Sequence, residues 1–277
     1  MSCSRLSELE TLAAALVKGA SMELYLTPKP GLVDRADNGS HPDLSLAVME
    51  RSIGFVSDYL GELVRSLAAG EAFPCQKAIG MRADQRLLDQ LGTNTHKGFI
   101  FLSGMLLIAR WHAASPDEGA LRSSLSSLCS RFFAAGDQGS SNGQQARRKY
   151  QAGGIVDESI RGFPSVFDEA VPAFRQAMRA SGDVEKASFS MLARLMQSVE
   201  DTTTLHRTGS DGLLRIKHDG LRLERLLASG GDYIACLKQL NRDYVRLNLT
   251  IGGVADMLGI AFAYLIASDE LANSFDR

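Results

Sequence analysis

The chain has 277 residues, of which 45% are hydrophobic and 22% are charged, so its composition is that of an ordinary globular protein with enough apolar side chains for a large core. The formal net charge of -2 gives the chain no overall attraction for nucleic acid or for an anionic membrane. The four cysteines are scattered without a Cys-x-x-Cys pair, which indicates neither a zinc site nor a disulfide framework.

The apolar segments of the chain are short. The run at residues 12–17 follows Glu8 and Glu10 and does not resemble a secretory signal. The most apolar stretches, at 99–109 and 254–267, are shorter than a membrane-spanning helix. We therefore expect a cytoplasmic protein with neither a membrane nor a nucleic acid as its partner.

The first predicted elements are two helices. Apolar residues recur three and four positions apart over residues 6–17, and the sequence Ser7-x-x-Glu10 has the form of a capping box. The first helix is therefore predicted to begin at this box. After an irregular segment at 24–43, the same spacing returns over 44–69 and stops at Gly70, which predicts a second, longer helix.

Helical spacing dominates the rest of the chain, and no alternating run bounded by hairpin turns competes with it. The fold class is therefore predicted to be all-α, with residues 1–277 forming a single-domain multi-helix bundle that has functional loops at its helix junctions. The polar stretch at 136–154 is predicted to be a surface loop. The further predicted helices span 77–91, 99–113, 118–135, 165–180, 184–199, 212–227, 233–245 and 254–267.

The first irregular segment, LYLTPKPGLVDRADNGSHPD at 24–43, is rich in polar chemistry. It contains three prolines, two glycines, three aspartates, a lysine and a histidine. Segments of this length without secondary structure of their own are uncommon in compact domains and are often binding loops. The segment is therefore a candidate for part of a site.

The second polar segment, GTNTHKG at 92–98, directly precedes an apolar helix. Thr93, Asn94 and Thr95 are common N-cap residues, so the segment could simply start that helix. His96 and Lys97 are not explained in this way. A helix N-terminus offers free N–H groups and a positive dipole end, and a lysine followed by glycine there would suit a phosphate group.

Two later junctions also carry carboxylates. In DTTTLHRTG at 201–209, Asp201 could cap a helical turn and Arg207 could be a solvated surface charge. In NLTIGGVADMLGIAFA at 248–263, a double glycine opens an apolar helix. Asp256 in that helix either stabilises the helix dipole or serves as a buried ligand carboxylate.

All four polar segments lie at helix junctions, and junctions at one end of a bundle can converge. Convergence would gather carboxylates that suit a divalent cation and cations that suit phosphate oxygens. The residues alone therefore predict a site for a phosphorylated ligand with Mg²⁺. Its members would be Lys29, Asp34, His41, Asp43, Asn94, His96, Lys97, Asp201, Arg207 and Asp256.

The order and spacing of these segments resemble the triphosphoribosyl-dephospho-CoA synthase family, whose members serve citrate lyase or malonate decarboxylase. The family pattern reads TPKPGLVD, GxHxD, NTHKG, DTNxLxRGG and LSPGGxAD, and it is matched here at 27–34, 39–43, 94–98, 201–209 and 249–256. The segment YQAGGIVDESIRGFP at 150–164 is also similar to a family segment. Departures from the pattern occur at Thr203, Thr208, Ile251 and Val156-Asp157.

The resemblance implies a transferase reaction. The 2'-hydroxyl of 3'-dephospho-CoA would attack C1' of the ATP ribose, adenine would leave, and 2'-(5''-triphosphoribosyl)-3'-dephospho-CoA would form. This product would be the precursor of a prosthetic group that a downstream transferase attaches to an acyl carrier protein. ATP would be a substrate, and Mg²⁺ is the expected cofactor.

The resemblance also assigns residues to three roles. Carboxylates and histidines suit proton transfer and the stabilisation of positive charge on a ribose, but the sequence does not separate the base from the acid. The catalytic candidates are His41, Asp43, His96 and Asp201; the substrate- and phosphate-binding candidates are Lys29, Asn94, Thr95, Lys97, Gly98, Thr202, Arg207, Gly252 and Gly253; and the metal-binding candidates are Asp34, Asp43, Asp201 and Asp256.

Two alternatives stay open at this stage. The departures at Thr203, Thr208 and Ile251 would suit another nucleotide ribosyltransferase or an N-glycoside hydrolase on the same scaffold. A nucleotide-binding protein without enzymatic activity would retain the same binding residues but turn over nothing. The sequence does not give the oligomeric state, although helical domains of this size often form homodimers.

Overall fold

A computed structural model describes residues 3–93, 95–136 and 142–271. Within these ranges the chain forms twelve α-helices and one π-helix and contains no strand, so the all-α prediction is confirmed. The helices are α1 (Cys3–Tyr25), α2 (Leu46–Ala68), α3 (Phe73–Leu91), α4 (Lys97–His112), α5 (Glu118–Ala134), α6 (Asn142–Tyr150), α7 (Gly154–Ile160), η1 (Ser165–Ala170), α8 (Val171–Ser181), α9 (Val184–Ser198), α10 (Thr202–Ser229), α11 (Tyr233–Leu247) and α12 (Gly252–Ala267).

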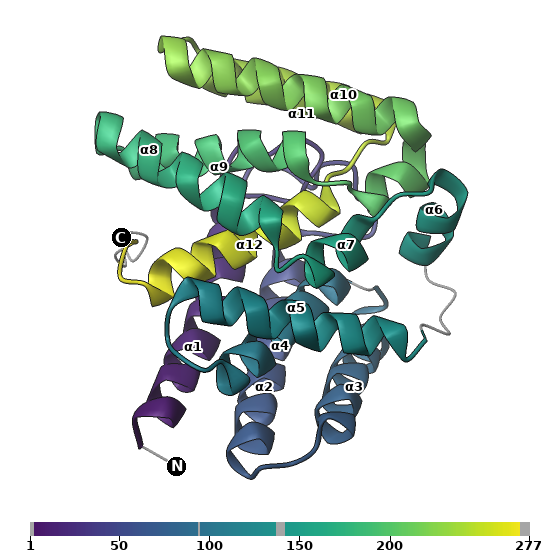
Figure 1. Cartoon of the computed structure of the whole chain (residues 1–277). Helices are drawn as coiled ribbons and strands as arrows, with labels where there is room; N and C mark the ends of the chain where they lie inside the picture. The colour runs from purple at the N-terminus through teal and green to yellow at the C-terminus, as the bar shows by residue number, and fades with distance from the viewer. Residues whose placement is uncertain (1–2, 94, 137–141, 272–277) are drawn as a thin grey trace.

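Helix α12 lies at the centre of the molecule. Figure 1 shows it in yellow between α1 on one side and α9 on the other. It packs against α1, α4, α9 and η1, and its sequence is apolar almost all the way round, as expected for a helix that is buried on every side. A Cβ atom at Gly19 of α1 would lie 2.3 Å from the carbonyl oxygen of Gly259 in α12. Glycine at position 19 therefore allows these two helices to touch through their backbones.

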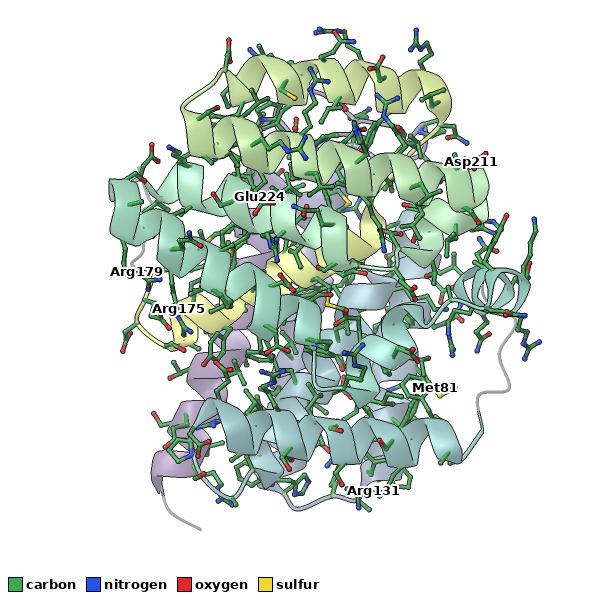
Figure 2. All side chains as sticks on the ribbon, turned by 45° about the horizontal axis from the view of Figure 1, so that its top comes forward. Met81, Arg131, Arg175, Arg179, Asp211 and Glu224 are labelled. Carbon is green, nitrogen blue, oxygen red and sulfur yellow. The ribbon has the colours of Figure 1, made fainter. Side chains whose placement is uncertain are left out.

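The other helices cover α12 from two sides. Helices α2, α3, α4 and α5 lie on the side of α1, and helices α8, α9, α10 and α11 lie on the opposite side (Figure 1). The buried apolar side chains form one cluster, whereas charged side chains such as Arg131, Arg179 and Asp211 lie on the outside (Figure 2). The organisation of residues 1–277 as a single domain stays a prediction. Among the helices described here, none has the length and apolar character needed to cross a membrane.

The predicted start of the first helix is wrong. Helix α1 already includes Cys3, so Ser7 lies inside the helix, and its carbonyl oxygen accepts a hydrogen bond of 2.9 Å from Thr11 Oγ1. A capping box must stand at the first free N–H groups of a helix to be effective, and here those groups lie further toward the N-terminus. The pattern Ser7-x-x-Glu10 is therefore not a cap.

The predicted surface loop at 136–154 contains a helix. Helix α6 spans Asn142–Tyr150, while residues 137–141 lie outside the described part of the chain. Its sequence is rich in glutamine, alanine, arginine and lysine, which favour helices, but only Ala146 is buried. Because the helix has almost no apolar face, hydrophobic spacing could not reveal it.

The helix predicted over 212–227 begins earlier than expected. Helix α10 starts at Thr202 and continues through a kink at Gly209, where φ is 72° and ψ is -164°. Asp201 caps this earlier start, so the polar segment at 201–209 belongs to the first turns of a long helix rather than to a loop before it. Residues 165–170 form the π-helix η1, and α8 follows it directly.

Candidate functional site

The four polar segments meet at one place in the fold. His41 Nε2 lies 2.8 Å from Thr250 Oγ1, and Thr204 Oγ1 donates to the carbonyl oxygen of Thr250 at 2.6 Å. These two bonds join the loop at 24–43 to the starts of α10 and α12. Thr93 Oγ1 donates to Asp43 Oδ2 at 2.9 Å, which joins the same loop to the segment before α4. The expectation that these junctions converge is thus confirmed.

Lys29 is fully buried and faces the end of α1. Its Nζ donates to the carbonyl oxygen of Leu24 at 3.0 Å and to that of Glu23, and it lies 3.3 Å from Glu23 Oε1. A charge removed from water in this way needs such partners, because an unpaired buried ammonium group would be very costly. In this structure the ammonium group of Lys29 therefore ties the loop to α1 rather than facing an open surface.

Asp34 closes the same loop. Its Oδ2 accepts a hydrogen bond of 2.7 Å from the backbone N–H of Lys29, and its Oδ1 accepts one of 2.7 Å from the backbone N–H of Ala36. The side chain is buried, with an exposed fraction of 3%. Both carboxylate oxygens are thus engaged by the backbone, which explains how a segment without helix or strand holds one conformation.

Glu23 is a member of the site that the sequence-based interpretation missed. Burial raises the pKa of its carboxyl, the neighbouring ammonium group of Lys29 lowers it, and the charge of Asp34 raises it. The residue follows Leu16, Gly19 and Ala20 at helical spacing on the buried face of α1. A carboxylate at a position where the pattern demands an apolar residue was the signal that could have identified it.

His41 and Arg207 connect the loop at 24–43 to α10 through side-chain contacts. Arg207 Nη2 lies 3.3 Å from His41 Nδ1, and Arg207 Nη1 donates to the carbonyl oxygen of Ser40 at 2.8 Å. Because a guanidinium group can only donate, Nδ1 must accept, and the proton of the neutral ring is on Nε2, which donates to Thr250 Oγ1. Burial and the charge of Arg207 lower the pKa of His41 to about 4. The ring is therefore neutral near pH 7.

The segment before α4 places His96 in the interior and Lys97 outside. Ser52 Oγ of α2 lies 2.6 Å from His96 Nδ1 and also contacts Thr95 Oγ1. Burial lowers the pKa of His96 to about 4, so this ring is neutral as well. The side chain of Lys97 is 53% exposed and forms an ion pair of 3.2 Å with Asp84. Lys97 therefore lies at the rim of the site.

Asp201 caps two helices at once. Its Oδ1 accepts from the backbone N–H groups of Thr203 at 2.9 Å and Thr204 at 3.0 Å, in the first turn of α10. Its Oδ2 accepts from the backbone N–H of Val254 in α12 at 3.1 Å. A Cβ atom at Gly253 would lie 3.1 Å from Asp201 Oδ2, so glycine there leaves room for the carboxylate. Burial raises the pKa of Asp201, and the N–H groups oppose that change.

Asp256 of α12 reaches the N-terminus of α4. A Cβ atom at Gly98 would lie only 2.0 Å from Asp256 Oδ2, so glycine is required for this approach. Burial raises the pKa of Asp256 well above its ordinary value, and the negative charges of Asp201 and Glu23 raise it further, while the backbone N–H of Phe99 lowers it. The negative charges of the buried Asp201 and Glu23 thus act on the half-buried Asp256 where α1, α10 and α12 meet.

Comparison with known proteins assigns this arrangement to a family. Residues 9–274 match the family model described as ATP:dephospho-CoA triphosphoribosyl transferase. The chain belongs to this family. The resemblance found in the sequence motifs is therefore confirmed, and the residues matched to the family include the region where α1, α10 and α12 meet.

Relatives in this family are similar along almost their whole length. A probable 2-(5''-triphosphoribosyl)-3'-dephosphocoenzyme-A synthase of Pseudomonas putida is 30% identical over 269 residues, which cover 92% of this chain and 94% of that protein. A protein of the same description from Azotobacter vinelandii is 34% identical, over 89% of this chain and 88% of its own. The 2-(5''-triphosphoribosyl)-3'-dephosphocoenzyme-A synthase of Pectobacterium atrosepticum is 33% identical, over 87% and 84%. No solved structure matches the chain.

Most of the predicted site residues of this family member lie at the meeting point. The bonds described above connect His41, Asp43, Thr95, His96, Asp201 and Arg207 to neighbouring segments, and Gly98 and Gly253 allow carboxylates to approach. Thr202 and Gly252 begin α10 and α12. Lys29 and Lys97 bind carboxylates of the protein itself, and Asn94 lies outside the described residues. The roles of all these residues stay predictions.

Proposed function

We propose that this chain transfers the triphosphoribosyl group of ATP to the 2'-hydroxyl of 3'-dephospho-CoA. A bond forms between the 2'-oxygen and C1' of the ATP ribose, the bond from C1' to adenine breaks, and the hydroxyl proton passes to a base. Membership of the transferase family and the names of the relatives support this reaction. The observation that carries the proposal is the convergence of the four polar segments, because they join at helix N-termini, where anionic groups are favoured.

His96 is the proton-transfer group that we favour. Breaking the bond to adenine requires the departing base to be protonated or hydrogen-bonded, and the attacking hydroxyl must lose its proton. His96 is neutral near pH 7, and its Nε2 has no hydrogen-bond partner among the described residues, whereas both nitrogens of His41 are engaged by Arg207 and Thr250. His41 would then position the loop and Arg207 rather than transfer a proton itself.

The carboxylates have different roles in this proposal. Positive charge develops on the ribose as adenine leaves, and a nearby carboxylate stabilises that charge. Asp43 is exposed beside His41, and among the described residues only its Oδ2 accepts a hydrogen bond, so it can face a substrate. Asp201 uses both oxygens on backbone N–H groups. We therefore expect Asp201 to hold the starts of α10 and α12 in place while its charge contributes to the field at the site.

Binding two polyanions together requires positive charge. Two unit charges about 8 Å apart repel by about 2 kcal/mol at an effective dielectric constant of about 20, and several such pairs would oppose joint binding. Arg207 and Lys97 would offset this repulsion, with Lys97, whose side chain is exposed, exchanging its partner Asp84 for phosphate. The backbone at the starts of α4, α10 and α12 would add N–H groups, from a set that includes Thr95, Gly98, Thr202 and Gly252, whereas the N–H of Gly253 already acts on Asp201.

Mg²⁺ is the cofactor that we propose, held jointly by protein and substrate. Within the described ranges no three His, Cys, Asp or Glu side chains are grouped so as to hold a metal ion. Mg²⁺ is commonly bound by one or two carboxylates together with substrate phosphates, so a preassembled protein centre is not required. Asp256 fits this role because a cation would offset the repulsion between its carboxylate and the negative charges of Asp201 and Glu23. Asp43 is the second candidate. Asp34 and Asp201 are weaker candidates because backbone N–H groups occupy them. When bound, the ion would neutralise phosphate charge.

The assembly and cellular setting are also proposals. Leu214 and Leu221 of α10 and Val245 and Leu247 of α11 are large apolar residues with exposed fractions of 41% to 66%. Exposed apolar residues on neighbouring helices are typical of surfaces that pair, so these residues support a homodimer. We expect the protein to act in the cytoplasm, and its product to pass to a downstream transferase and then to an acyl carrier protein.

Mass spectrometry of the products tests the proposed reaction. Purified protein with ATP, 3'-dephospho-CoA and Mg²⁺ should yield adenine and the triphosphoribosyl adduct in equal amounts, and omission of 3'-dephospho-CoA should abolish adenine release. Adenine release without 3'-dephospho-CoA would indicate an N-glycoside hydrolase instead. A folded protein that binds ATP but releases no adenine under any of these conditions would refute an enzymatic role.

A further inference from the structure

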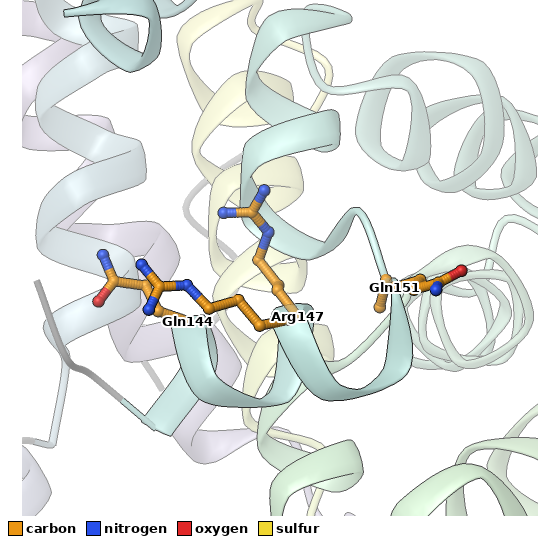
Figure 3. Close-up of a pocket in the computed structure, with 5 residues that line it drawn as sticks. Gln144, Arg147 and Gln151 are labelled. Carbon is orange, nitrogen blue, oxygen red and sulfur yellow. The ribbon is translucent and has the colours of Figure 1, made fainter. Parts of the chain in front are cut away.

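A cavity lies beside the meeting point, on helix α6. It has a volume of about 230 Å³ and is lined by Gln144, Arg147, Arg148, Gln151 and Ala152. We call it the α6 cavity. In Figure 3 the side chain of Arg147 extends from the helix between Gln144 and Gln151. Two guanidinium groups and two amide groups thus line one hollow, and none of these side chains carries a negative charge.

Among the described residues, the two arginines of the α6 cavity lack the carboxylate partners that some other arginines have. Arg122 pairs with Asp168 at 2.6 Å and Arg175 with Glu270 at 2.6 Å. Within the described part of the chain, by contrast, Arg147 and Arg148 form no ion pair, and Nε of Arg147 is buried without a hydrogen-bond acceptor. A buried donor without an acceptor is costly, so Nε of Arg147 indicates an acceptor that the described residues do not provide.

The α6 cavity is packed against the start of α10. A Cβ atom at Gly154, whose φ is +53°, would lie 2.5 Å from the methyl group of Thr202 and 3.5 Å from Cδ of Arg147. The backbone N–H of Gly153 donates to Glu200 Oε2 at 2.8 Å, just before the cap of α10. Glycine therefore allows the segment after α6 to lie directly on the first turn of α10, and the cavity borders the candidate site.

The size and charge of the cavity define its ligand. Pockets that enclose a whole small molecule typically have about 300–1,000 Å³, so the α6 cavity suits one group of a larger ligand that extends from the neighbouring site. Guanidinium groups bind phosphate oxygens with paired hydrogen bonds, and side-chain amides can donate further ones. An uncharged or cationic group would leave the two arginines without a counter-charge.

We propose that the α6 cavity binds phosphate groups of a nucleotide substrate, through Arg147 and Arg148. The proposal rests on the proposed function, because both of its substrates carry phosphates: the triphosphate of ATP and the diphosphate of 3'-dephospho-CoA. Neither arginine was among the site residues predicted from the sequence. The phosphates would supply the acceptor that Arg147 lacks and would be anchored beside the start of α10.

Charge-removing substitutions on α6 test this proposal. Arg147→Gln and Arg148→Gln remove one positive charge each, and Lys149→Gln removes one from the same helix outside the cavity, where Lys149 lies over the ring of Tyr150 at 4.9 Å. Steady-state kinetics of the full chain give kcat and a separate Michaelis constant, KM, for each of the two substrates. The dissociation constant of inorganic tripolyphosphate is measured separately by calorimetry, and circular dichroism verifies the fold.

Each arginine variant should weaken tripolyphosphate binding about tenfold and raise the KM of one substrate about tenfold, with kcat changed less than the KM, since a charge-assisted hydrogen bond is lost. Lys149→Gln should change these values less than about twofold. Weaker binding of ATP alone would identify the triphosphate as the ligand, and weaker binding of the dephospho-CoA substrate alone would identify its diphosphate. Arg148→Gln, at an exposed position, decides the question if Arg147→Gln does not fold.

The outcomes separate this proposal from the proposed function. If the unmodified chain forms no adduct but Arg148→Gln still weakens tripolyphosphate binding, the proposed reaction fails and the phosphate site stands. If the unmodified chain forms the adduct but the arginine variants keep normal KM values and tripolyphosphate affinity, the α6 cavity is not a phosphate site. Equal losses in Lys149→Gln and Arg148→Gln would also overturn it, because they would reflect only the overall charge of the helix.

Discussion

Replacing Asp201 with alanine removes a carboxylate that joins the N-termini of two helices. The side chain accepts hydrogen bonds from Thr203 and Thr204 in α10 and from Val254 in α12. Asp183 provides a matched control. It is the N-cap of α9 and accepts a hydrogen bond of 3.0 Å from the backbone N–H of Lys186. Unlike Asp201, it is exposed, and among the described residues it accepts no hydrogen bond from a second helix. The two substitutions therefore differ in the bridge to α12 and in burial.

The expected cost follows from the donors left without an acceptor. Loss of an aspartate N-cap typically costs about 1 kcal/mol, and this is the value expected for Asp183→Ala. Asp201→Ala also leaves the buried N–H of Val254 unsatisfied, which adds about 1–3 kcal/mol. Burial raises the pKa of Asp201, so removal of its charge returns part of that cost. We therefore expect Asp201→Ala to lower the free energy of unfolding by about 2–3 kcal/mol.

Thermal unfolding followed by circular dichroism measures this difference. For a chain of this size, about 1 kcal/mol corresponds to about 2 °C in the midpoint. The midpoint should fall by about 4–6 °C for Asp201→Ala and by about 2 °C for Asp183→Ala. Equal shifts in the two variants would show that the bond from Asp201 to α12 contributes nothing, and the cross-helix cap would then be only a geometric coincidence.

Four further predictions concern the buried charges and the close contacts of the site. Lys29→Met should lower the free energy of unfolding by about 3 kcal/mol because it leaves Glu23 unpaired in the interior, and Glu23→Gln in the same chain should recover part of this loss in urea titrations. The pKa of His96 is about 4 in the folded state and about 6.5 when unfolded, so the unfolded state binds more protons between these values. The contribution of His96 to stability should therefore fall by about 2–3 kcal/mol from pH 7 to pH 4.5. His96→Gln should lose this part of the pH dependence and keep the part due to His41, whose pKa is also about 4. Gly98→Ala should lower the thermal midpoint because its Cβ would meet Asp256, whereas Gly54→Ala in α2, with nothing within 4 Å, should raise stability by about 0.5–1 kcal/mol. A chelator of divalent cations should abolish adduct formation, and added Mg²⁺ should restore it; activity that survives chelation would refute the metal requirement.

The helices that could be predicted from sequence are those that bury an apolar face. The predicted bounds of α2, α5 and α9 lie close to their observed ends because leucine and other apolar residues recur on one side of each. Helix α6 buries only Ala146 and is held by contacts with α10. The spacing of apolar residues therefore could not predict this helix. The start of α1 could not be predicted either, because the helix begins at Cys3, before the regular spacing of apolar residues begins at residue 6.

The candidate site was predictable as a set of segments but not as a set of bonds. Polar residues at helix junctions are visible in a sequence, and Asp201 was recognisable as a potential cap. The partners were not visible, because Asp201 reaches Val254 across 53 positions and Lys29 turns back to Glu23 instead of toward a ligand. Glu23 could have been noticed as a carboxylate on an apolar stripe, but its pairing with Lys29 depends on how the loop folds over α1.

The contacts give a physical reason why the motif residues occur at these spacings. The residues that precede α4 and α12 provide no side-chain cap. Carboxylates from elsewhere in the fold approach these two helix N-termini instead. Asp256 of α12 approaches the start of α4, and Asp201 accepts a hydrogen bond from the start of α12. Such crossed caps require a glycine wherever a carboxylate must approach backbone, as at Gly98 and Gly253. Three helix N-termini are thereby fixed in one region, where their dipoles favour anions. Because the charges of Asp201 and Glu23 act on Asp256, we expect a cation to be favoured in this region, and the same cation would offset the charge of two polyphosphate substrates.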